Sequence, residues 1–230
     1  MKRLILGDGL LGAEIRKQTG WPAISRKQHN IDFRYLETYA RYLEEYDEVI
    51  NCIAYCNTYD KERQIHWDVN YKGLVQLVDH IAATKKKLIH ISTDYVYSNS
   101  VSQASENDVP VHCANWYGYT KLIGDAYVQL TLNDFLLLRG THKPKPFMYD
   151  KAYLNQIGNF DYVDRLAQIM IELIENNVYG LYNVGTELKT MLDLAKQTKP
   201  NVGISIERFN ETMPGDVSLD LTKLQKIIEV

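Results

Sequence analysis

Two tyrosines and one lysine stand close together in the segment NWYGYTKLIGD, residues 115–125. In an α-helix successive residues turn by about 100°, so positions four apart lie within about 40° of each other. Tyr117 and Lys121 therefore share one face of the expected helix, whereas Tyr119 points elsewhere. A lysine ammonium beside a phenol stabilises the phenolate and lowers the tyrosine pKa, which eases proton donation near neutral pH. Tyr117 is therefore a candidate general acid.

A strand-like run, KLIHIS, comes before this segment and places Ser92, Thr93 and Asp94 at the carboxyl end of a strand. In open parallel sheets, ligands bind at that edge. A hydroxyl there, facing Tyr117, can hydrogen-bond a substrate carbonyl while a nicotinamide delivers hydride. Without a hydroxyl and a cofactor site nearby, the Y-x-x-x-K spacing is a common chance pattern. The catalytic interpretation therefore requires a cofactor site close to these residues.

The expected cofactor site is the run LILGDGLLGAEI, in which Gly7, Gly9 and Gly12 have the spacing G-x-G-x-x-G between a strand and a helix. The first glycine makes the tight turn, the second lets the backbone approach a pyrophosphate, and the third allows close helix–strand packing. The amides and dipole of the helix N-terminus favour the phosphate charge. A glycine-rich turn without a ligand is the alternative.

The end of the second strand indicates which dinucleotide is bound. An NAD site usually has an acidic residue there, about 20 residues after the glycines, whereas this chain has Ser25, Arg26 and Lys27. A hydroxyl and two cations suit a 2′-phosphate, because arginine offers a planar fork of donors. NADPH is the expected cofactor, with NADH as the alternative. A basic surface turn is the competing interpretation of these residues.

Short apolar runs alternate with helix-periodic runs along the chain, an order typical of a doubly wound parallel sheet in an α/β, Rossmann-like fold. The expected strands cover residues 2–6, 21–25, 47–54, 87–92, 134–138 and 180–185. The expected helices cover residues 10–18, 33–43, 67–84, 116–130 and 162–176. We predict a dinucleotide-binding core over 1–139 and a reduced substrate-binding region over 140–230. The second region is interleaved with the last core elements, within one compact unit, and residues 140–160 are expected to be loop or cap material.

Composition argues for a protein with a sizeable core and no polyanionic partner. The 230 residues are 45% hydrophobic and 24% charged, with a net charge of −3, so neither nucleic acid nor a membrane is an expected partner. The N-terminal apolar run is too short for a signal peptide, and no segment approaches a membrane span, so a cytoplasmic location is expected. Cys52, Cys56 and Cys113 have no metal-type spacing, and the first two are expected to be small buried hydrophobic residues. His90 lies in a strand and is expected to be a satisfied core residue.

The chain resembles the extended short-chain dehydrogenase/reductases, and most closely the dTDP-4-dehydrorhamnose reductase family. The matching segments are GDGLLG, DEVINCIAY, DVNYKGLVQLV, HISTDYVY, WYGYTKLIGD, LLLRG, NFDYVDRLA and DVSLDLTKL, in the order of the family. The resemblance implies that Thr93 is the catalytic hydroxyl, with Ser92 as the competing candidate. It implies that Tyr117 is the general acid, and that Lys121 both binds the ribose and tunes Tyr117.

Together with the glycine loop and the basic turn, the resemblance gives two sets of expected site residues. The cofactor set is Gly7, Gly9, Leu10, Leu11, Gly12, Ser25, Arg26, Lys27, Asp32, Phe33, Asn51, Ile53, Ala54, Asn70, Ser92, Tyr117 and Lys121. The substrate set is Tyr55, Thr93, Tyr95, Val96, Tyr117 and His142. No metal site is expected. Homodimers are common among similar enzymes, whereas the sequence itself indicates no oligomeric state.

The substrate half departs from the family pattern more than the cofactor half. The glycine loop is one residue shorter than G-x-x-G-x-x-G, and the segment 140–160 is shorter than its equivalent in the family. Met213 stands before Pro214 where the family tends to have arginine. His112 and Cys113 precede the catalytic helix, but their setting does not match the pair of the epimerising relatives.

The resemblance implies an NADPH-dependent reductase of a nucleotide-linked 4-keto-6-deoxy sugar, as in dTDP-rhamnose-type biosynthesis. Its substrate would then be a small-molecule nucleotide sugar. The shortened segment leaves two alternatives open. One is a non-catalytic NADP-binding regulatory subunit of the methionine adenosyltransferase β type. The other is a reductase of a smaller carbonyl compound.

Overall fold

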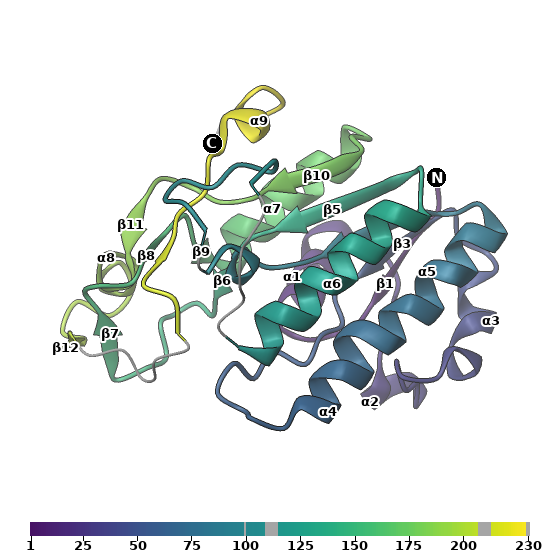
Figure 1. The fold of residues 1–230 in the computed structure, drawn as a ribbon, viewed down its shortest axis with the longest axis horizontal. Coiled ribbons are helices and arrows are strands. Elements are labelled where there is room, and N and C mark those ends of the chain that lie inside the picture. Colours follow the sequence, from purple (N-terminus) through teal and green to yellow (C-terminus); the bar gives the residue numbers. More distant parts are fainter. Residues whose placement is uncertain (99, 109–114, 207–212, 229–230) are drawn as a thin grey trace.

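A parallel sheet forms the centre of the molecule. The computed structural model describes residues 1–98, 100–108, 115–206 and 213–228, and within them six parallel strands follow the order β10-β5-β4-β3-β1-β2 (Figure 1). These strands are β1 (Arg3–Leu6), β2 (Ala23–Ile24), β3 (Glu48–Asn51), β4 (Lys87–Ile91), β5 (Phe135–Arg139) and β10 (Gly180–Asn183). The order reverses beside β1, and in such sheets ligands bind at the carboxyl ends of the strands near that point. The predicted doubly wound α/β fold is confirmed.

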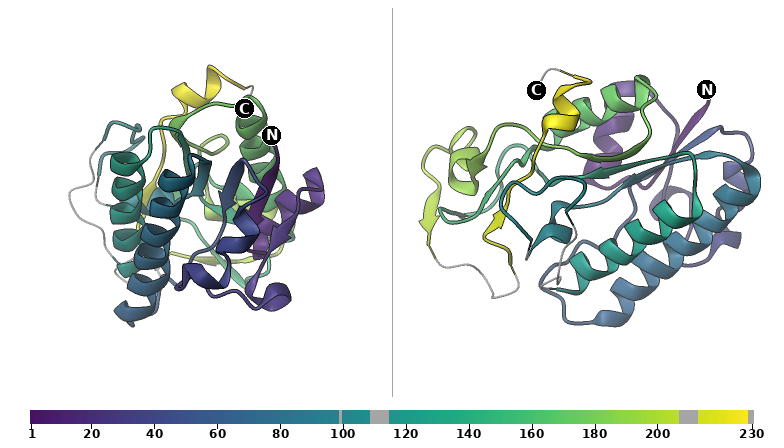
Figure 2. Two further views of the ribbon diagram at one scale, coloured as in Figure 1. Left: turned by 90° about the vertical axis from the view of Figure 1, so that its right-hand side faces the viewer. Right: turned by 45° about the horizontal axis from the view of Figure 1, so that its top comes forward.

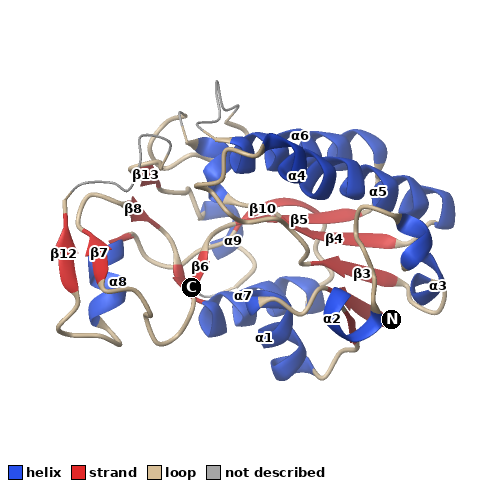
Figure 3. Cartoon of the chain, turned by 90° about the horizontal axis from the view of Figure 1, so that it is seen from below, coloured by secondary structure: helices blue, strands red, loops and turns tan. Residues whose placement is uncertain are grey.

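Helices cover both faces of this sheet, as Figures 2 and 3 show. One layer contains α1 (Leu10–Thr19) and α7 (Val163–Glu175), and the other contains α5 (Gly73–Thr84) and α6 (Trp116–Thr131). Shorter helices are α2 (Arg26–His29), α3 (Ala40–Leu43), α4 (Arg63–His66), α8 (Met191–Lys196) and α9 (Thr222–Gln225). A π-helical segment, Trp67–Lys72, joins α4 to α5 without a break. None of the described helices is long and apolar enough to cross a membrane.

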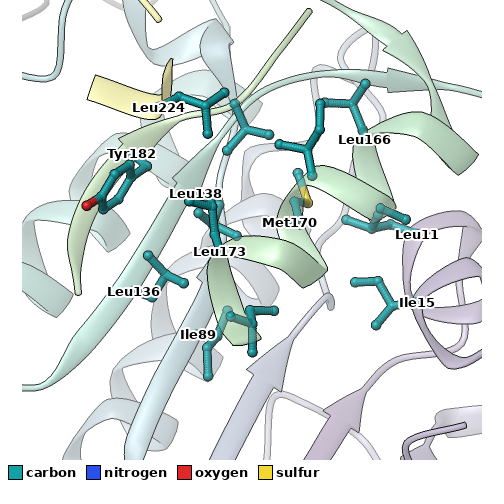
Figure 4. Packing of buried hydrophobic residues seen from close by; sticks show 14 of the residues in the cluster. Leu11, Ile15, Ile89, Leu136, Leu138, Leu166, Met170, Leu173, Tyr182 and Leu224 are labelled. Atoms are coloured by element: carbon teal, nitrogen blue, oxygen red, sulfur yellow. The ribbon is translucent and has the colours of Figure 1, made fainter. Parts of the chain in front are cut away.

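Each strand of the sheet sends alternate side chains into two separate cores. Leu136 and Leu138 of β5 pack toward α1 and α7, whereas Leu137 between them packs toward α5 and α6. Helix α7 contributes Leu166 and Met170, four residues apart on one face, to the first core (Figure 4). Because both faces of the sheet are covered, the strands are continuous apolar runs, which is why the sequence identified them.

A smaller lobe is built from the later part of the chain. Its strands are β6 (His142–Lys143), β7 (Lys151–Tyr153), β8 (Ile157–Gly158), β9 (Asp161–Tyr162), β11 (Lys189–Thr190), β12 (Gly203–Ser205) and β13 (Asp216–Val217). A third core, with Phe147, Phe160 and Leu194 among its members, holds β7 and α8 together. Between the lobe segments the chain returns to the main sheet as α7 and β10 (Figure 1). The division at residue 139 stays a prediction.

One expectation from periodicity is wrong. Residues 33–43 do not form one helix but a 3₁₀ turn at Leu36–Thr38 followed by α3. The chain bends there because Phe33 and Tyr39 stack on each other inside the core, with ring centroids 5.7 Å apart. Residues 140–160, expected to be loop or cap material, contain the short strands β6, β7 and β8 of the smaller lobe.

A buried ion pair joins α6 to the sheet. Asp125 of α6 accepts a hydrogen bond from Arg139 of β5 at 2.9 Å and another from the Ser92 hydroxyl at 2.8 Å. Arg139 also donates to the Tyr97 hydroxyl at 2.7 Å. The side chains of Arg139 and Asp125 are 5% and 1% exposed, so neither charge has water as a substitute partner.

We therefore predict that Asp125→Asn lowers the free energy of unfolding by about 3 kcal/mol, because it leaves a buried guanidinium without its counter-charge. Urea denaturation followed by circular dichroism measures this loss. The matched control is Asp68→Asn, which breaks an exposed pair with Lys72 and is expected to cost about 1 kcal/mol or less. Equal effects of the two substitutions would contradict the importance of the buried pair.

Candidate active site

The glycine loop between β1 and α1 has three glycines in three different environments. Gly7 has a positive φ of 99°, a conformation that L side chains rarely adopt. A Cβ on Gly12 would lie 2.1 Å from the Gly7 carbonyl oxygen, so only glycine allows this close approach of helix to strand. A Cβ on Gly9 would meet nothing within 4 Å, and Gly9 lines a cleft of about 720 Å³. The loop therefore keeps open space at the N-terminus of α1, where a pyrophosphate would fit.

The turn after β2 faces an acid that was not among the expected site residues. Asp8, from the glycine loop, accepts a hydrogen bond from the Ser25 hydroxyl at 2.8 Å. Ser25 also caps α2, because its oxygen accepts from the Gln28 N–H at 3.2 Å. Arg26 and Lys27 lie exposed on the same turn, so cations and a carboxylate stand together where the adenosine ribose is expected. The clue in the sequence was the position of Asp8 between the first two glycines.

Thr93 and Tyr117 meet at the carboxyl end of β4. Thr93 caps the 3₁₀ turn Asp94–Tyr97, and its hydroxyl lies close enough to that of Tyr117 to lower the pKa of Tyr117. Asn115 caps α6 by accepting from the Gly118 N–H at 2.8 Å, and Tyr95 meets Tyr117 edge-on at 6.0 Å. Desolvation raises the pKa of Tyr117 well above its ordinary value, and the Thr93 hydroxyl lowers it only in part. A tyrosine in this state keeps its proton until a basic oxygen arrives.

Lys121 shares the helix face of Tyr117, as predicted, but its ammonium atom has other partners. Nζ lies 3.0 Å from Nε2 of His90 and donates to the carbonyl of Ile91 at 2.7 Å. Burial lowers the pKa of Lys121, and the nearby charge of Asp125 raises it in part. Within the described residues, no hydrogen bond joins Lys121 to Tyr117, and the expected effect of Lys121 on the Tyr117 pKa stays a prediction.

A cleft of about 720 Å³ contains the glycine loop, Thr93 and Tyr117 together. Its walls come from both parts of the molecule. The main sheet and its loops contribute Gly9, Leu10, Leu11, Ala54, Ile91, Ser92, Thr93, Tyr95 and Tyr117, and the smaller lobe contributes His142, Lys143, Phe147, Tyr149, Lys151, Tyr153, Gln156, Met191 and Met213. The shortened segment 140–160 therefore still forms one wall of a large cleft.

Several expected cofactor residues do not line this cleft. Asn51 hydrogen-bonds the Ile53 N–H and the His90 ring, and Asn70 holds the backbone of Tyr55 at 2.7 and 3.1 Å. The side-chain amides of Asn51 and Asn70 therefore hold the loop after β3 in place without lining the cleft.

The pair predicted near the adenine also has structural partners. Phe33 is buried against Tyr39, because its ring packs in the hydrophobic core. Asp32 forms an exposed ion pair with Arg34 at 2.6 Å. Of the two, only Asp32 is accessible to a ligand in this arrangement.

Some of the expected substrate residues line the cleft and others do not. Thr93, Tyr95, Tyr117 and His142 line the cleft. Val96 is 0% exposed in the core between the sheet and α7, so its expected contact with a substrate is wrong. Its neighbour Tyr95 takes the cleft side of the turn instead.

Tyr55 also faces away from the cleft. Its hydroxyl donates to Asp60 at 2.5 Å, and its ring meets His66 edge-on at 4.9 Å. Both partners belong to the loop and helix after β3, so Tyr55 holds this segment rather than a substrate. The expected substrate contact of Tyr55 is therefore wrong for this structure.

The competing hydroxyl, Ser92, is committed elsewhere. Its Oγ donates to the buried Asp125, whereas Thr93 is the residue whose hydroxyl lies close to that of Tyr117. This favours Thr93 as the hydroxyl of the site. Ser92 and Ala54 both line the cleft, and their expected contact with a cofactor stays a prediction.

Cys52 and Cys56 are not the fully buried residues that the sequence suggested. Cys52 is partly buried, Cys56 is exposed, and both line the cleft. They end there because β3 stops at Asn51 and the chain turns along the sheet edge. His112 and Cys113 lie outside the described residues, which contain no group of three or more metal-ligating side chains.

Two further residues lie at or beside the site without having been assigned a role from the sequence. Asp94 is 0% exposed and accepts a hydrogen bond from the Thr141 hydroxyl at 2.6 Å, and burial raises its pKa to about 6. Lys143 of β6 lines the cleft close enough to Asp94 for its charge to lower the Asp94 pKa in part. Burial lowers the pKa of Lys143 itself. Its run, HKPKP, has no periodicity, so the sequence offered only its charge as a signal.

Comparison with known proteins agrees with this architecture. Residues 1–142 match the family model described as RmlD substrate binding domain. The chain is 27% identical over 208 residues to the spore coat polysaccharide biosynthesis protein SpsK of Bacillus subtilis, covering 80% of this chain and 72% of that protein. It is 26% identical to the dTDP-4-dehydrorhamnose reductase of Mycolicibacterium smegmatis, covering 87% of this chain and 68% of the other.

Solved structures show the same fold. A hypothetical dTDP-4-dehydrorhamnose reductase from Sulfolobus tokodaii superposes with a TM-score of 0.83 at 21% identity, covering 100% of this chain and 96% of that one. The dTDP-4-dehydrorhamnose reductase of Bacillus anthracis, solved in complex with NADP, gives 0.83 at 21% identity, covering 98% and 92%. The predicted family resemblance is confirmed.

The glycine loop leads to a prediction that separates folding from cofactor binding. Gly9→Ala should leave the free energy of unfolding within about 1 kcal/mol, because its Cβ meets open space, yet weaken NADPH binding about tenfold or more by occupying that space. Fluorescence titration and urea denaturation measure the two quantities. Gly12→Ala is the control, expected to destabilise the fold through its contact with Gly7. Unchanged NADPH affinity in Gly9→Ala would count against the assigned cofactor position.

Proposed function

We propose that this chain reduces the keto group of a nucleotide-linked 4-keto-6-deoxy sugar with NADPH. The chain belongs to the RmlD substrate binding domain family of extended short-chain dehydrogenase/reductases. One observation carries the proposal: a single cleft is lined both by the open glycine loop and by Thr93 and Tyr117. A nicotinamide extending from the loop would reach a carbonyl held by these hydroxyls.

The chemistry follows from the positions of these side chains. When bound, the reduced cofactor supplies hydride to the carbonyl carbon. Thr93 orients the carbonyl oxygen, and Tyr117 gives its proton to the alkoxide that forms there. Because desolvation raises the pKa of Tyr117, the phenol stays protonated before reaction. Lys121, one helical turn further along α6, supplies positive charge near the phenolate when it is an ammonium.

The size and charge of the cleft support a substrate larger than a simple ketone. Its volume of about 720 Å³ lies within the range typical of small-molecule and cofactor sites and spans both the main sheet and the smaller lobe. Lys143 and Lys151 on the lobe wall offer positive charge for a diphosphate. Tyr149 and Tyr153 on the same wall offer ring faces for a sugar or a base.

The cofactor assignment rests on the exposed cations Arg26 and Lys27, which suit a 2′-phosphate. The complex of the Bacillus anthracis reductase with NADP is consistent with this choice. Asp8 beside Ser25 favours a free ribose hydroxyl instead, so NADH is the alternative donor. Comparing the kcat/KM values for the two donors decides between them.

We predict that Tyr117→Phe lowers kcat by about 10²–10⁴-fold, because it removes the proton donor, while NADPH affinity stays the same. The assay follows loss of NADPH absorbance with a panel of 4-keto-6-deoxy nucleotide sugars. Tyr119→Phe is the matched control, since Tyr119 is 42% exposed on another face of α6. If neither the parent chain nor the variant consumes NADPH with any substrate, a non-catalytic cofactor-binding role is favoured.

A second prediction concerns the substrate. Lys143→Met should raise KM for a nucleotide sugar about tenfold with kcat nearly unchanged, because a charge-assisted contact to the diphosphate is lost. Lys145→Met is the control, because Lys145 lies two residues away but pairs with Asp164 outside the cleft. A KM that stays constant in Lys143→Met would place the diphosphate elsewhere.

A further inference from the structure

A chain of buried hydrogen bonds joins β3, β4 and α6. The backbone N–H of Ile53 donates to Asn51 Oδ1 at 3.0 Å, and Asn51 Nδ2 lies 3.1 Å from Nδ1 of His90. The other ring nitrogen of His90, Nε2, lies 3.0 Å from Nζ of Lys121, which donates to the Ile91 carbonyl at 2.7 Å. His90 and Lys121 are each 1% exposed, so water does not compete for these atoms.

The backbone N–H of Ile53, at one end of this series of hydrogen bonds, determines which atom donates in each of them. An amide N–H can only donate, so the Asn51 oxygen faces Ile53 and the Asn51 amino group must donate to Nδ1 of His90. A neutral imidazole carries one proton, which is then on Nε2. The Nε2–H group faces Nζ of Lys121, and only an unprotonated amine has a lone pair to accept its hydrogen.

The other protonation states leave two donors face to face. An ammonium on Lys121 requires an unprotonated Nε2, which moves the ring proton to Nδ1, opposite the Asn51 amino group. Turning the Asn51 amide over would relieve that contact but place its amino group against the Ile53 N–H. An imidazolium has the same conflict and adds a second positive charge 3.0 Å from Nζ. Because His90 and Lys121 are buried, each such contact costs as much as an unmade buried hydrogen bond.

The charges around Lys121 agree with a neutral amine. On α6, Asp125 is the nearest acid, but its charge is paired with Arg139 at 2.9 Å. From β3 and the loop after it, Lys121 faces the thiols Cys52 and Cys56. Burial raises the pKa of Cys52 to about 12, so this thiol carries no counter-charge. Burial also lowers the pKa values of both Lys121 and His90, in the same direction as the hydrogen-bond pattern.

We propose that His90 is a positioning residue that holds Lys121 as a neutral amine in the cofactor-free protein and thereby sets the alkaline limit of the reduction. Protonating Lys121 forces His90 into its other tautomer against Asn51, which makes the ammonium form of Lys121 costly. Because the ammonium favours the phenolate that Tyr117 becomes, turnover falls as the pH rises and Lys121 loses its proton. The kinetic part rests on the proposed function, whereas the tautomer of His90 does not.

The tautomer is tested directly by ¹⁵N NMR of protein labelled at histidine. We expect His90 of the cofactor-free protein to be the neutral Nε2–H tautomer at pH 9, with its signals assigned among the six histidines by their loss in His90→Gln. A lysine with an ordinary pKa would still be charged at about pH 9. An Nδ1–H tautomer or an imidazolium at that pH would overturn the proposal, whether or not the protein reduces any sugar.

The kinetic consequence is tested with the pH profile of kcat/KM. In His90→Gln a side-chain carbonyl can accept from the Lys121 ammonium, so the alkaline limb should move up by about one pH unit. His80→Gln, on the outer helix α5, should leave the limb in place. A His90→Gln variant that loses activity equally at every pH, with the limb unmoved, would show a merely structural role and overturn the proposal.

Discussion

The ion pair between Asp125 and Arg139 is the interaction on which the site depends. It connects α6 to β5, and through the Ser92 hydroxyl it also holds the end of β4. Asp125 lies four residues after Lys121 and eight after Tyr117, so one contact sets the rotation of the whole helix face. With that face turned toward β4, Tyr117 meets Thr93 and Lys121 meets His90. The buried charge pair therefore fixes geometry that a purely apolar contact, which is not directional, would leave free to slide.

The parts of the site that could be predicted are those in which local spacing determines position. Glycine spacing predicted a tight turn at the first strand–helix junction, because Gly7 has a positive φ and Gly12 packs against the Gly7 carbonyl within the same short segment. Helical periodicity separated Tyr117 from Tyr119, and Tyr119 is 42% exposed on another face. The fold class followed from apolar strands alternating with helices, which a sheet covered on both faces requires. All of these signals lie within a few residues of the feature that they predict.

The parts that could not be predicted depend on contacts between distant segments. Spacing placed Tyr117 and Lys121 on one face but could not show that β4 would present the His90 ring and the Ile91 carbonyl to the lysine. Val96 and Phe33 were themselves predicted site residues, and only the packed structure shows that their side chains lie in the core. Lys143 reaches the cleft because β6 pairs with β9, which follows β7 and β8 along the chain, and no local pattern indicates that pairing.

The direction of the buried hydrogen bonds also explains why an expected interaction is missing. Helical spacing predicted a charged lysine beside the phenol, yet Lys121 lies in a dry pocket with a donor imidazole on one side and a carbonyl on the other. A neutral amine satisfies both partners, whereas an ammonium satisfies only one. Charge on Lys121 is therefore a property that the site acquires rather than one it holds at rest. Bringing an anionic cofactor into the glycine loop would favour that charge, because the added negative potential stabilises the ammonium over the amine. The same step that loads the hydride donor would then prepare the proton donor.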